Sequence, residues 1–239
     1  MKKAGLILIV TALVFFTAGC ASSARTALLA QKDPIALVSM VSNEDINWEG
    51  EPPEDPRVAG PLTKKKLRSD SDLVIVTAAD EIINIAEGIF RNTIAASAQI
   101  SLADKDTVLN SRAYLEAKEK KYTKRDMVKP DNYRFVDYGD RKFLAALAAE
   151  TGINRSMFIE FNLTKYMISG IGKFGNARTE VKMLVIILDA KGKTIYRKEH
   201  IAVGDSTMHV SNGIYSQMEL TELFRESITE ACYDFLEQL

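Results

Sequence analysis

The chain has 239 residues, of which 46% are hydrophobic and 26% charged, and its 31 basic and 32 acidic residues give a net charge of −1 at pH 7. This length and composition are ordinary for a globular protein with a sizeable core. The near-neutral charge argues against bulk binding of nucleic acid, which requires a strong positive field.

The first twenty residues have the pattern of a secretory signal. Lys2 and Lys3 are followed by an apolar run over residues 4–16 and then by Thr-Ala-Gly-Cys at 17–20. At about 1.5 Å per residue the apolar run forms roughly 20 Å of helix, well short of the ~30 Å core of a bilayer. Residues 1–19 are therefore predicted to be a removable signal peptide.

Residues 18–20, Ala-Gly-Cys, resemble the lipobox of bacterial lipoproteins. The resemblance implies that Cys20 receives a lipid on its thiol and becomes the first residue of the mature chain. Thr17 stands where that family usually has Leu, so ordinary signal cleavage nearby and a plain structural cysteine are the alternatives. Residues 20–33 would then be a lipidated tether, and Ala21 is compatible with sorting to the outer membrane.

A single domain is expected over residues 34–239, beginning with a strand, a long loop and a helix. The apolar run at 35–41 is short and indicates a buried strand. The polar, proline-rich stretch at about 43–71 predicts a long irregular surface loop. Apolar positions at helical spacing predict a helix over 72–96, with its apolar stripe facing the core rather than a bilayer.

Basic residues gather at two places in this half of the chain. One is the run Lys64, Lys65 and Lys66 in the predicted loop, and the other spans residues 118–125. Either cluster could contact a partner or anionic head groups, at about 1 kcal/mol per well-placed charge. Ordinary solvation of a charged surface is the alternative for both.

The middle of the chain is predicted to contain short elements. In order, the pattern indicates a brief strand at 99–102, a helix at 104–121, an irregular stretch at 122–132, an extended piece at 133–138 and a helix at 140–150 ended by Gly152. The positions expected to face inward on the first of these helices are Val108, Leu109, Ala113, Leu115 and Ala117.

The strongest strand signal lies at 156–168, where the residues alternate with a period of two. One set, expected to face the core, is Ile159, Phe161, Leu163 and Lys165; the other is Phe158, Glu160, Asn162 and Thr164. A second, more continuously apolar strand at 181–188 is expected to be central and buried on both faces. A tight turn at Lys191 and Gly192 leads into a third strand at 194–203, and a helix at 216–238 closes the chain.

Together these elements predict an α/β (α+β) fold. We expect a mixed sheet with a C-terminal antiparallel three-strand meander, flanked by about four helices. Such a meander also offers an edge to which a partner strand can be added.

The order of elements resembles the periplasmic domain shared by the curli-secretion lipoprotein family and the amino-terminal domain of TolB. The likeness is carried by residues 35–41, by residues 145–153 leading into the strand at Phe158, and by residues 188–193. It implies this architecture and an envelope setting. The curli-secretion family forms pores from paired hairpins, but no equally convincing pair stands out here, and the propeller repeats of TolB are missing from the sequence.

Residues 170–175, Gly-Ile-Gly-Lys-Phe-Gly, match the letters of a dinucleotide-binding fingerprint. That site requires a helix after the glycines, whose N-terminus meets the pyrophosphate. The segment that follows, residues 179–188, is instead predicted to be a strand. We therefore expect a connection between two strands, with no cofactor, in which Gly170, Gly172 and Phe174 are candidate contacts with a partner or membrane.

No catalytic or metal-binding motif is recognised. His200 is expected on a strand and His209 in the loop before the last helix, without the spacing of zinc ligands. Cys232 lies among apolar positions at helical spacing, and we expect it to pack as a small hydrophobe. Neither a nucleophile elbow nor a phosphate-binding loop is found. No catalytic, metal or cofactor residue is therefore assigned.

These observations predict a lipid-anchored envelope protein that is a non-enzymatic binding or assembly module, most simply on the periplasmic face of the outer membrane. Its expected partners are the membrane, through the lipid, and other envelope proteins; homo-oligomers are open, and nucleic acid is not expected. One alternative is a membrane-inserting or pore-forming lipoprotein. Another is an envelope hydrolase, which predicts a cleft with facing carboxylates or a Ser/His pair.

Overall fold

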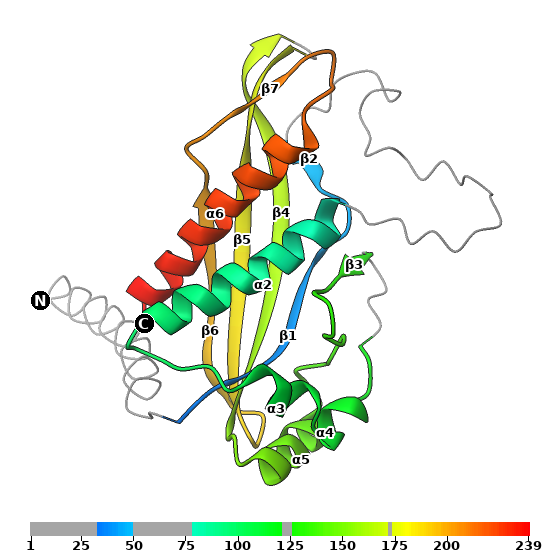
Figure 1. The fold of residues 1–239 in the computed structure, drawn as a ribbon, viewed down its shortest axis with the longest axis vertical. Helices are drawn as coiled ribbons and strands as arrows, with labels where there is room; N and C mark the ends of the chain where they lie inside the picture. The colour runs from blue at the N-terminus through cyan, green and yellow to red at the C-terminus, as the bar shows by residue number, and fades with distance from the viewer. Residues whose placement is uncertain (1–32, 50–77, 121–125, 172–173) are drawn as a thin grey trace, which may run out of the picture.

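The computed structural model describes residues 33–49, 78–120, 126–171 and 174–239 (Figure 1). The predicted signal peptide and most of the predicted loop at 43–71 lie outside these residues, as do the candidate site residues Cys20, Lys64, Lys65, Lys66 and Gly172.

The centre of the fold is a mixed sheet. Its described strands are β1 (Ala36–Asn43), β2 (Asn47–Glu49), β3 (Met127–Val128), β4 (Arg155–Ile171), β5 (Phe174–Asp189), β6 (Thr194–Val203) and β7 (Met208–Val210). The order across the sheet is β3-β1-β4-β5-β6, with β2 beside β4 and β7 beside β5. β1 and β2 run parallel to β4, whereas the other pairs are antiparallel. The mixed sheet and the meander β4-β5-β6 confirm the predicted fold class.

The structure describes five helices, where about four were expected. They are α2 (Ala78–Ala96), α3 (Lys105–Leu109), α4 (Arg112–Leu115), α5 (Arg141–Thr151) and α6 (Gln217–Glu237). α2 and α6 lie side by side across one face of the sheet, and α3, α4 and α5 gather at one end of the molecule (Figure 1).

The main core lies between the sheet and the pair α2 and α6. Phe90 of α2 and Phe235 of α6 are fully buried and stack with their ring centroids 6.0 Å apart. The apolar stripe of α2 is buried as predicted, at Ala79, Ile82, Ile83, Ala86, Phe90 and Ile94. The apolar stripe of α2 therefore faces the core, and its helical periodicity does not require contact with a bilayer.

The side chain of Asn43, the last residue of β1, bonds to β4 between the residues of β4 that pair with β1 and those that pair with β2. Its Nδ2 donates to the carbonyl oxygen of Leu163 at 3.0 Å, and the backbone N–H of Leu163 donates to its Oδ1 at 2.7 Å. The side-chain amide thus replaces a peptide group in the ladder beside β4. The prediction of a loop from residue 43 was wrong at its start, because β1 reaches Asn43 and β2 follows it.

The predicted helix at 104–121 is two short helices, α3 and α4. Ser111 breaks it: its hydroxyl accepts the N–H of Tyr114 and so caps a new helix start. The carboxylate of Glu150 accepts hydrogen bonds from the backbone N–H groups of Arg112 and Ala113 at 2.7 and 2.8 Å. These bonds satisfy two more of the free N–H groups in the first turn of α4. Leu115, expected to face inward, is 54% exposed because the break shifts the helical phase.

Three further predictions for the middle of the chain need correction. In place of the strand at 99–102 there is a single bridge between Leu102 and Ile35, and the extended piece at 133–138 is a single bridge between Val136 and Glu119. The stretch at 122–132, expected to be irregular, contains β3. These short pairings form with residues far away in the sequence, so the segments carry no clear periodicity from which they could be predicted.

The remaining elements follow the prediction closely. α5 is capped by Asp140 and ends at Gly152, whose φ of 75° lies in the left-handed region that glycine adopts without strain. The expected core set of β4 is buried, and Phe158 on the opposite side is also buried, with its ring 6.1 Å from that of Tyr138. β5 lies inside the sheet, but continuous burial is limited to residues 185–188.

Candidate functional site

Apolar side chains gather toward the free end of the long β4-β5 hairpin, which extends beyond the helices (Figure 1). Ile168 of β4 and Phe174 of β5 are 42% and 55% exposed. Ile214, in the turn after β7, is 68% exposed, and Met218, in the first turn of α6, is 75% exposed. We call these four residues the apolar end. Scattered apolar residues are normal on a surface, but several at one end of the molecule mark a candidate contact surface.

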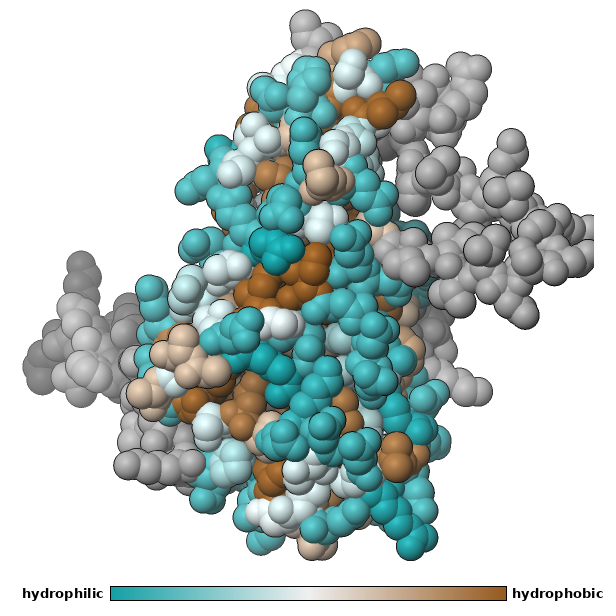
Figure 2. Space-filling model, viewed as in Figure 1, coloured by the Kyte–Doolittle hydropathy of each residue, from teal (hydrophilic) through white to brown (hydrophobic). Residues whose placement is uncertain are grey.

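Apolar colour is visible at the top of the molecule in Figure 2, over this hairpin end. Of the predicted contact residues, Phe174 belongs to the apolar end, and Gly172 lies outside the described residues. The segment after the glycines is β5, so the dinucleotide pattern is followed by a strand, as predicted, and not by the helix that a pyrophosphate site needs.

Gly170 and Gly175 pair across the hairpin and shape its end. Gly170 has a φ of 123°, which only glycine adopts readily. A Cβ on Gly175 would lie 1.9 Å from the carbonyl oxygen of Ser169, so the two backbones approach more closely than any side chain permits. Gly170 therefore has a clear backbone role, and its predicted contact role stays a prediction.

A short strand and a tight turn lie beside the β4-β5 hairpin. β7 pairs with β5 at Gly175 to Ala177, and the turn that follows is closed by two hydrogen bonds of 2.9 Å between Ser211 and Ile214. Asn212 and Gly213 both have positive φ, at 53° and 77°, as in a type I′ turn. The turn presents Ile214 to solvent. His209 lies in β7 and not in a loop, which corrects the prediction.

Beneath the apolar end, two aromatic rings enclose the ammonium of Lys165. Lys165 is only 2% exposed. Its Nζ lies 5.0 Å from the ring centroid of Trp48 and 5.4 Å from that of Tyr215, and it donates to the carbonyl oxygen of Ile46. The two rings meet edge to face, with centroids 6.0 Å apart. We call Lys165, Trp48 and Tyr215 the aromatic cage.

The aromatic cage joins three segments of the chain: β2, β4 and the short connection between the turn after β7 and α6. Burial lowers the pKa of Lys165 to about 8, although the nearby charge of Asp45 opposes the shift. Both rings offer cation–π contacts to the protonated amine. The cage therefore packs Tyr215, the residue that follows the turn carrying Ile214, against β4.

A hydrogen-bonded chain that is buried at His200 and partly exposed at Asp234 links β6 to α6. The Tyr196 hydroxyl lies 2.9 Å from Nε2 of His200, and a carboxylate oxygen of Asp234 lies 2.7 Å from Nδ1. A neutral imidazole whose Nδ1–H donates a hydrogen bond to the carboxylate can accept a hydrogen bond from the tyrosine hydroxyl at Nε2. Burial lowers the pKa of His200 despite Asp234, and the nearby positive charge of Lys198 acts in the same direction. His200 lies on a strand, as predicted.

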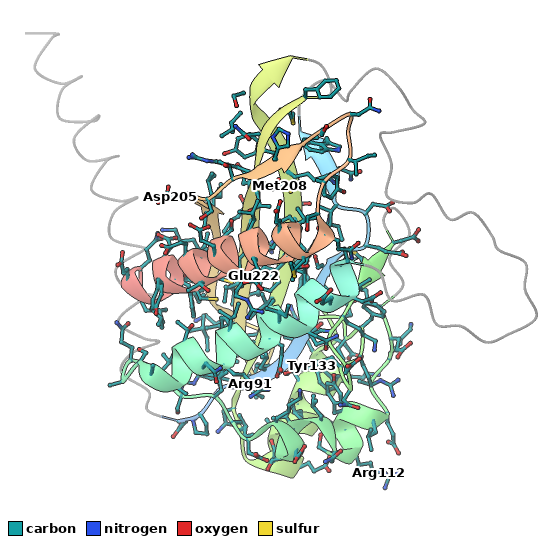
Figure 3. All side chains as sticks on the ribbon, turned by 45° about the horizontal axis from the view of Figure 1, so that its top comes forward. Arg91, Arg112, Tyr133, Asp205, Met208 and Glu222 are labelled. Atoms are coloured by element: carbon teal, nitrogen blue, oxygen red, sulfur yellow. The ribbon has the colours of Figure 1, made fainter. Side chains whose placement is uncertain are left out.

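Another polar cluster ties α2 to the segment before α5. Arg91 donates to the Tyr133 hydroxyl at 2.7 Å, and this hydroxyl donates to the Glu87 carboxylate at 3.2 Å. Lys105 lies 3.2 Å from the same carboxylate. Figure 3 shows Arg91 and Tyr133 close together between their elements. Since these partners satisfy one another, the cluster holds the fold together.

An open acidic groove of about 260 Å³ lies between the second half of β6 and α6. It is lined by Ile201, Ala202, Val203, Asp205, Glu226, Glu230 and Asp234, and we call it the β6 groove. Two of its carboxylates have structural partners: Asp234 contacts His200, and Glu226 accepts the backbone N–H groups of Asp205 and Ser206. Three of the four carboxylates lie in one row on α6, and two of the four help to hold the loop and the helix in place.

Cys232 is fully buried on α6, and burial raises its pKa to about 12. It packs as a small apolar group, as predicted. Within the described residues, no group of three or more His, Cys, Asp or Glu side chains is arranged to hold a metal ion. No helix in the same part of the chain is both long and apolar enough to cross a bilayer.

Comparison with models of known protein families and with curated protein sequences finds no match. The fold defines the chain as a mixed-sheet α/β protein. Sequence reasoning singled out Phe174, whose contact role stays a prediction, but did not identify the aromatic cage or the β6 groove. The sequence contained one sign of the cage, because it placed a lysine, Lys165, on the face of a strand that was expected to be buried.

Proposed function

We propose that this chain is a lipid-anchored protein of the bacterial cell envelope that acts as a non-enzymatic binding or assembly module at the membrane surface. The observation that carries the proposal is the apolar end, whose four side chains are 42–75% exposed, two on the β4-β5 hairpin, one in the turn after β7 and one in the first turn of α6. Apolar groups exposed to water favour contact with another apolar surface.

The lipid anchor is the second part of the proposal and rests on residues 18–20 of the sequence. Two or more acyl chains on Cys20 would hold the protein durably on the periplasmic face of the outer membrane. Confinement at that surface raises the effective concentration of partners on the same membrane. A modest contact at the apolar end is then sufficient for assembly.

Cys20→Ala tests the anchor. The wild-type chain should incorporate a clickable fatty acid in cells and sediment with the outer membrane, whereas the variant should incorporate none and appear in the soluble fraction. A variant that is still labelled and still sediments would contradict lipidation at Cys20.

Phe174→Ser tests the apolar end, and Leu115→Ser is its matched control. The two side chains are 55% and 54% exposed, but Leu115 lies on α4, at the other end of the molecule. Cross-linking in intact cells should recover an envelope protein with the wild-type chain and with Leu115→Ser, and lose it with Phe174→Ser. Equal recovery with all three chains would refute the assignment of the contact surface.

A membrane-inserting function is the alternative that one observation favours, because Ile168 and Phe174 project from a hairpin and could enter lipid. Release of dye from liposomes by the unlipidated chain, abolished by Phe174→Ser, would support insertion and overturn the binding proposal. The binding proposal predicts no leakage.

A further inference from the structure

The β6 groove lies beside a free strand edge. Among the described residues β6 pairs only with β5, so its other edge carries backbone groups without a strand partner. Edge strands of this kind can accept an added strand from another chain, and the main-chain hydrogen bonds then supply much of the affinity.

The second half of β6 has the composition of a docking edge. Ile201 and Val203 border the β6 groove and are 53% and 39% exposed. They alternate along the strand with the buried His200 and Ala202, and His200 contacts α6, so the side chains of Ile201 and Val203 point to the opposite face of the sheet. Arg197 and Lys198 lie on the first half of the strand, where charged side chains protect an edge from pairing. The accessible edge is therefore limited to residues 199–203.

On the other side of the same edge, α6 presents a row of carboxylates. Glu226, Glu230 and Asp234 are four residues apart, so they recur at about 6 Å along one side of the helix. Alternate residues of a β-strand are about 6.6–6.8 Å apart. A strand added to β6 would thus place every second side chain opposite this row at nearly the same spacing.

We infer that the edge of β6 at 199–203 binds an extended peptide segment in which basic and apolar residues alternate. The basic side chains face the carboxylates of the β6 groove, and the apolar side chains lie beside Ile201 and Val203. Charge complementarity selects a basic partner, and the strand spacing selects an alternating one. This edge is separate from the apolar end, and binding at it requires no lipid anchor.

The test uses the full-length chain in detergent micelles and the fluorescent peptide acetyl-KVKIKVK-amide, with binding measured by anisotropy. The controls are the block-ordered peptide KKKKVIV, of the same composition, and an alternating peptide N-methylated at successive central residues. We expect saturable binding of the alternating peptide that weakens as salt is added, and much weaker binding of both controls.

Glu230→Lys and Glu222→Lys form the matched pair of protein variants. Both residues are exposed on α6, but Glu222, labelled in Figure 3, does not line the groove. Glu230→Lys should weaken the alternating peptide about tenfold, and Glu222→Lys less than about twofold. Circular dichroism checks that each variant is folded.

Three results would overturn the inference. The first is a failure of the alternating peptide to bind, or binding of a control peptide as tight as that of the alternating peptide. Equal binding of a control would show that the net charge of the peptide, and not strand addition, accounts for binding. The second is an equal effect of the two lysine variants. The third is a concentration-dependent dimer of the chain that Glu230→Lys dissociates and the peptide does not enter, because a second copy would then be the occupant of the edge.

Discussion

Replacing Lys165 by Met gives the most quantitative prediction for the aromatic cage. Methionine keeps an unbranched stem between Trp48 and Tyr215 but removes the amine. Burial lowers the pKa of Lys165 from the ordinary lysine value of 10.5 to about 8. At about 1.4 kcal/mol per pKa unit, keeping this amine charged in the folded state lowers the free energy of unfolding at neutral pH by about 3 kcal/mol.

The sign of the pH dependence follows from these two values. Below pH 8 both states hold the proton and the full cost is present. Between pH 8 and pH 10.5 the folded state has lost the proton while the unfolded state keeps it, so the free energy of unfolding rises with pH. Relative to Lys165→Met, the wild-type chain should therefore gain about 2 to 3 kcal/mol between pH 8 and pH 10.

Urea unfolding at several pH values, followed by the fluorescence of Trp48, measures this difference. Trp48 is the single tryptophan of the chain, and its ring lies 5.0 Å from the Lys165 amine. Lys191→Met, at an exposed turn position, is the control and should change by less than about 0.5 kcal/mol. Parallel stability curves for the wild type and Lys165→Met across this pH range would refute the reasoning.

Three other predictions concern the core and the hairpin. Because burial lowers the pKa of His200, acidification below about pH 6.5 should destabilise the wild type more than His200→Gln in thermal unfolding; equal pH profiles would contradict this. In a Cys20→Ala background, Cys232 should react with a thiol reagent only after urea is added, since it is fully buried. Gly175→Val should lower the free energy of unfolding by about 1–3 kcal/mol, because a Cβ at this position collides with the backbone. Gly88→Ala on α2, where a Cβ meets open space, should raise it by up to about 1 kcal/mol. Equal effects of the two variants in urea titrations would contradict the hairpin geometry.

Strong periodicity predicted the larger elements well. The alternation at 156–168 fixed the core face of β4, and the helical spacing of α6 placed Cys232 inside. The helix at 104–121 was misjudged because the sequences on both sides of Ser111 favour helix, and only the cap reveals that two helices meet there. This phase change also explains why Leu115 is exposed.

The elements that were missed are short and depend on partners elsewhere in the chain. β2 and β7 have three residues each and exist through pairing with β4 and β5. The aromatic cage requires both: β2 supplies Trp48, and the turn after β7 leads to Tyr215. The alternation of β4 could place Lys165 on the core face, but it could not show which rings would surround its amine.

The most direct test of the proposed function is site-specific photo-cross-linking in intact cells. A photoreactive amino acid at position 174 replaces Phe174, and the same group at position 115 replaces the equally exposed Leu115. We predict that position 174 gives a discrete adduct with an envelope protein and that position 115 gives none. Adducts of equal yield at both positions, or adducts with lipid alone at position 174, would contradict a protein-binding module.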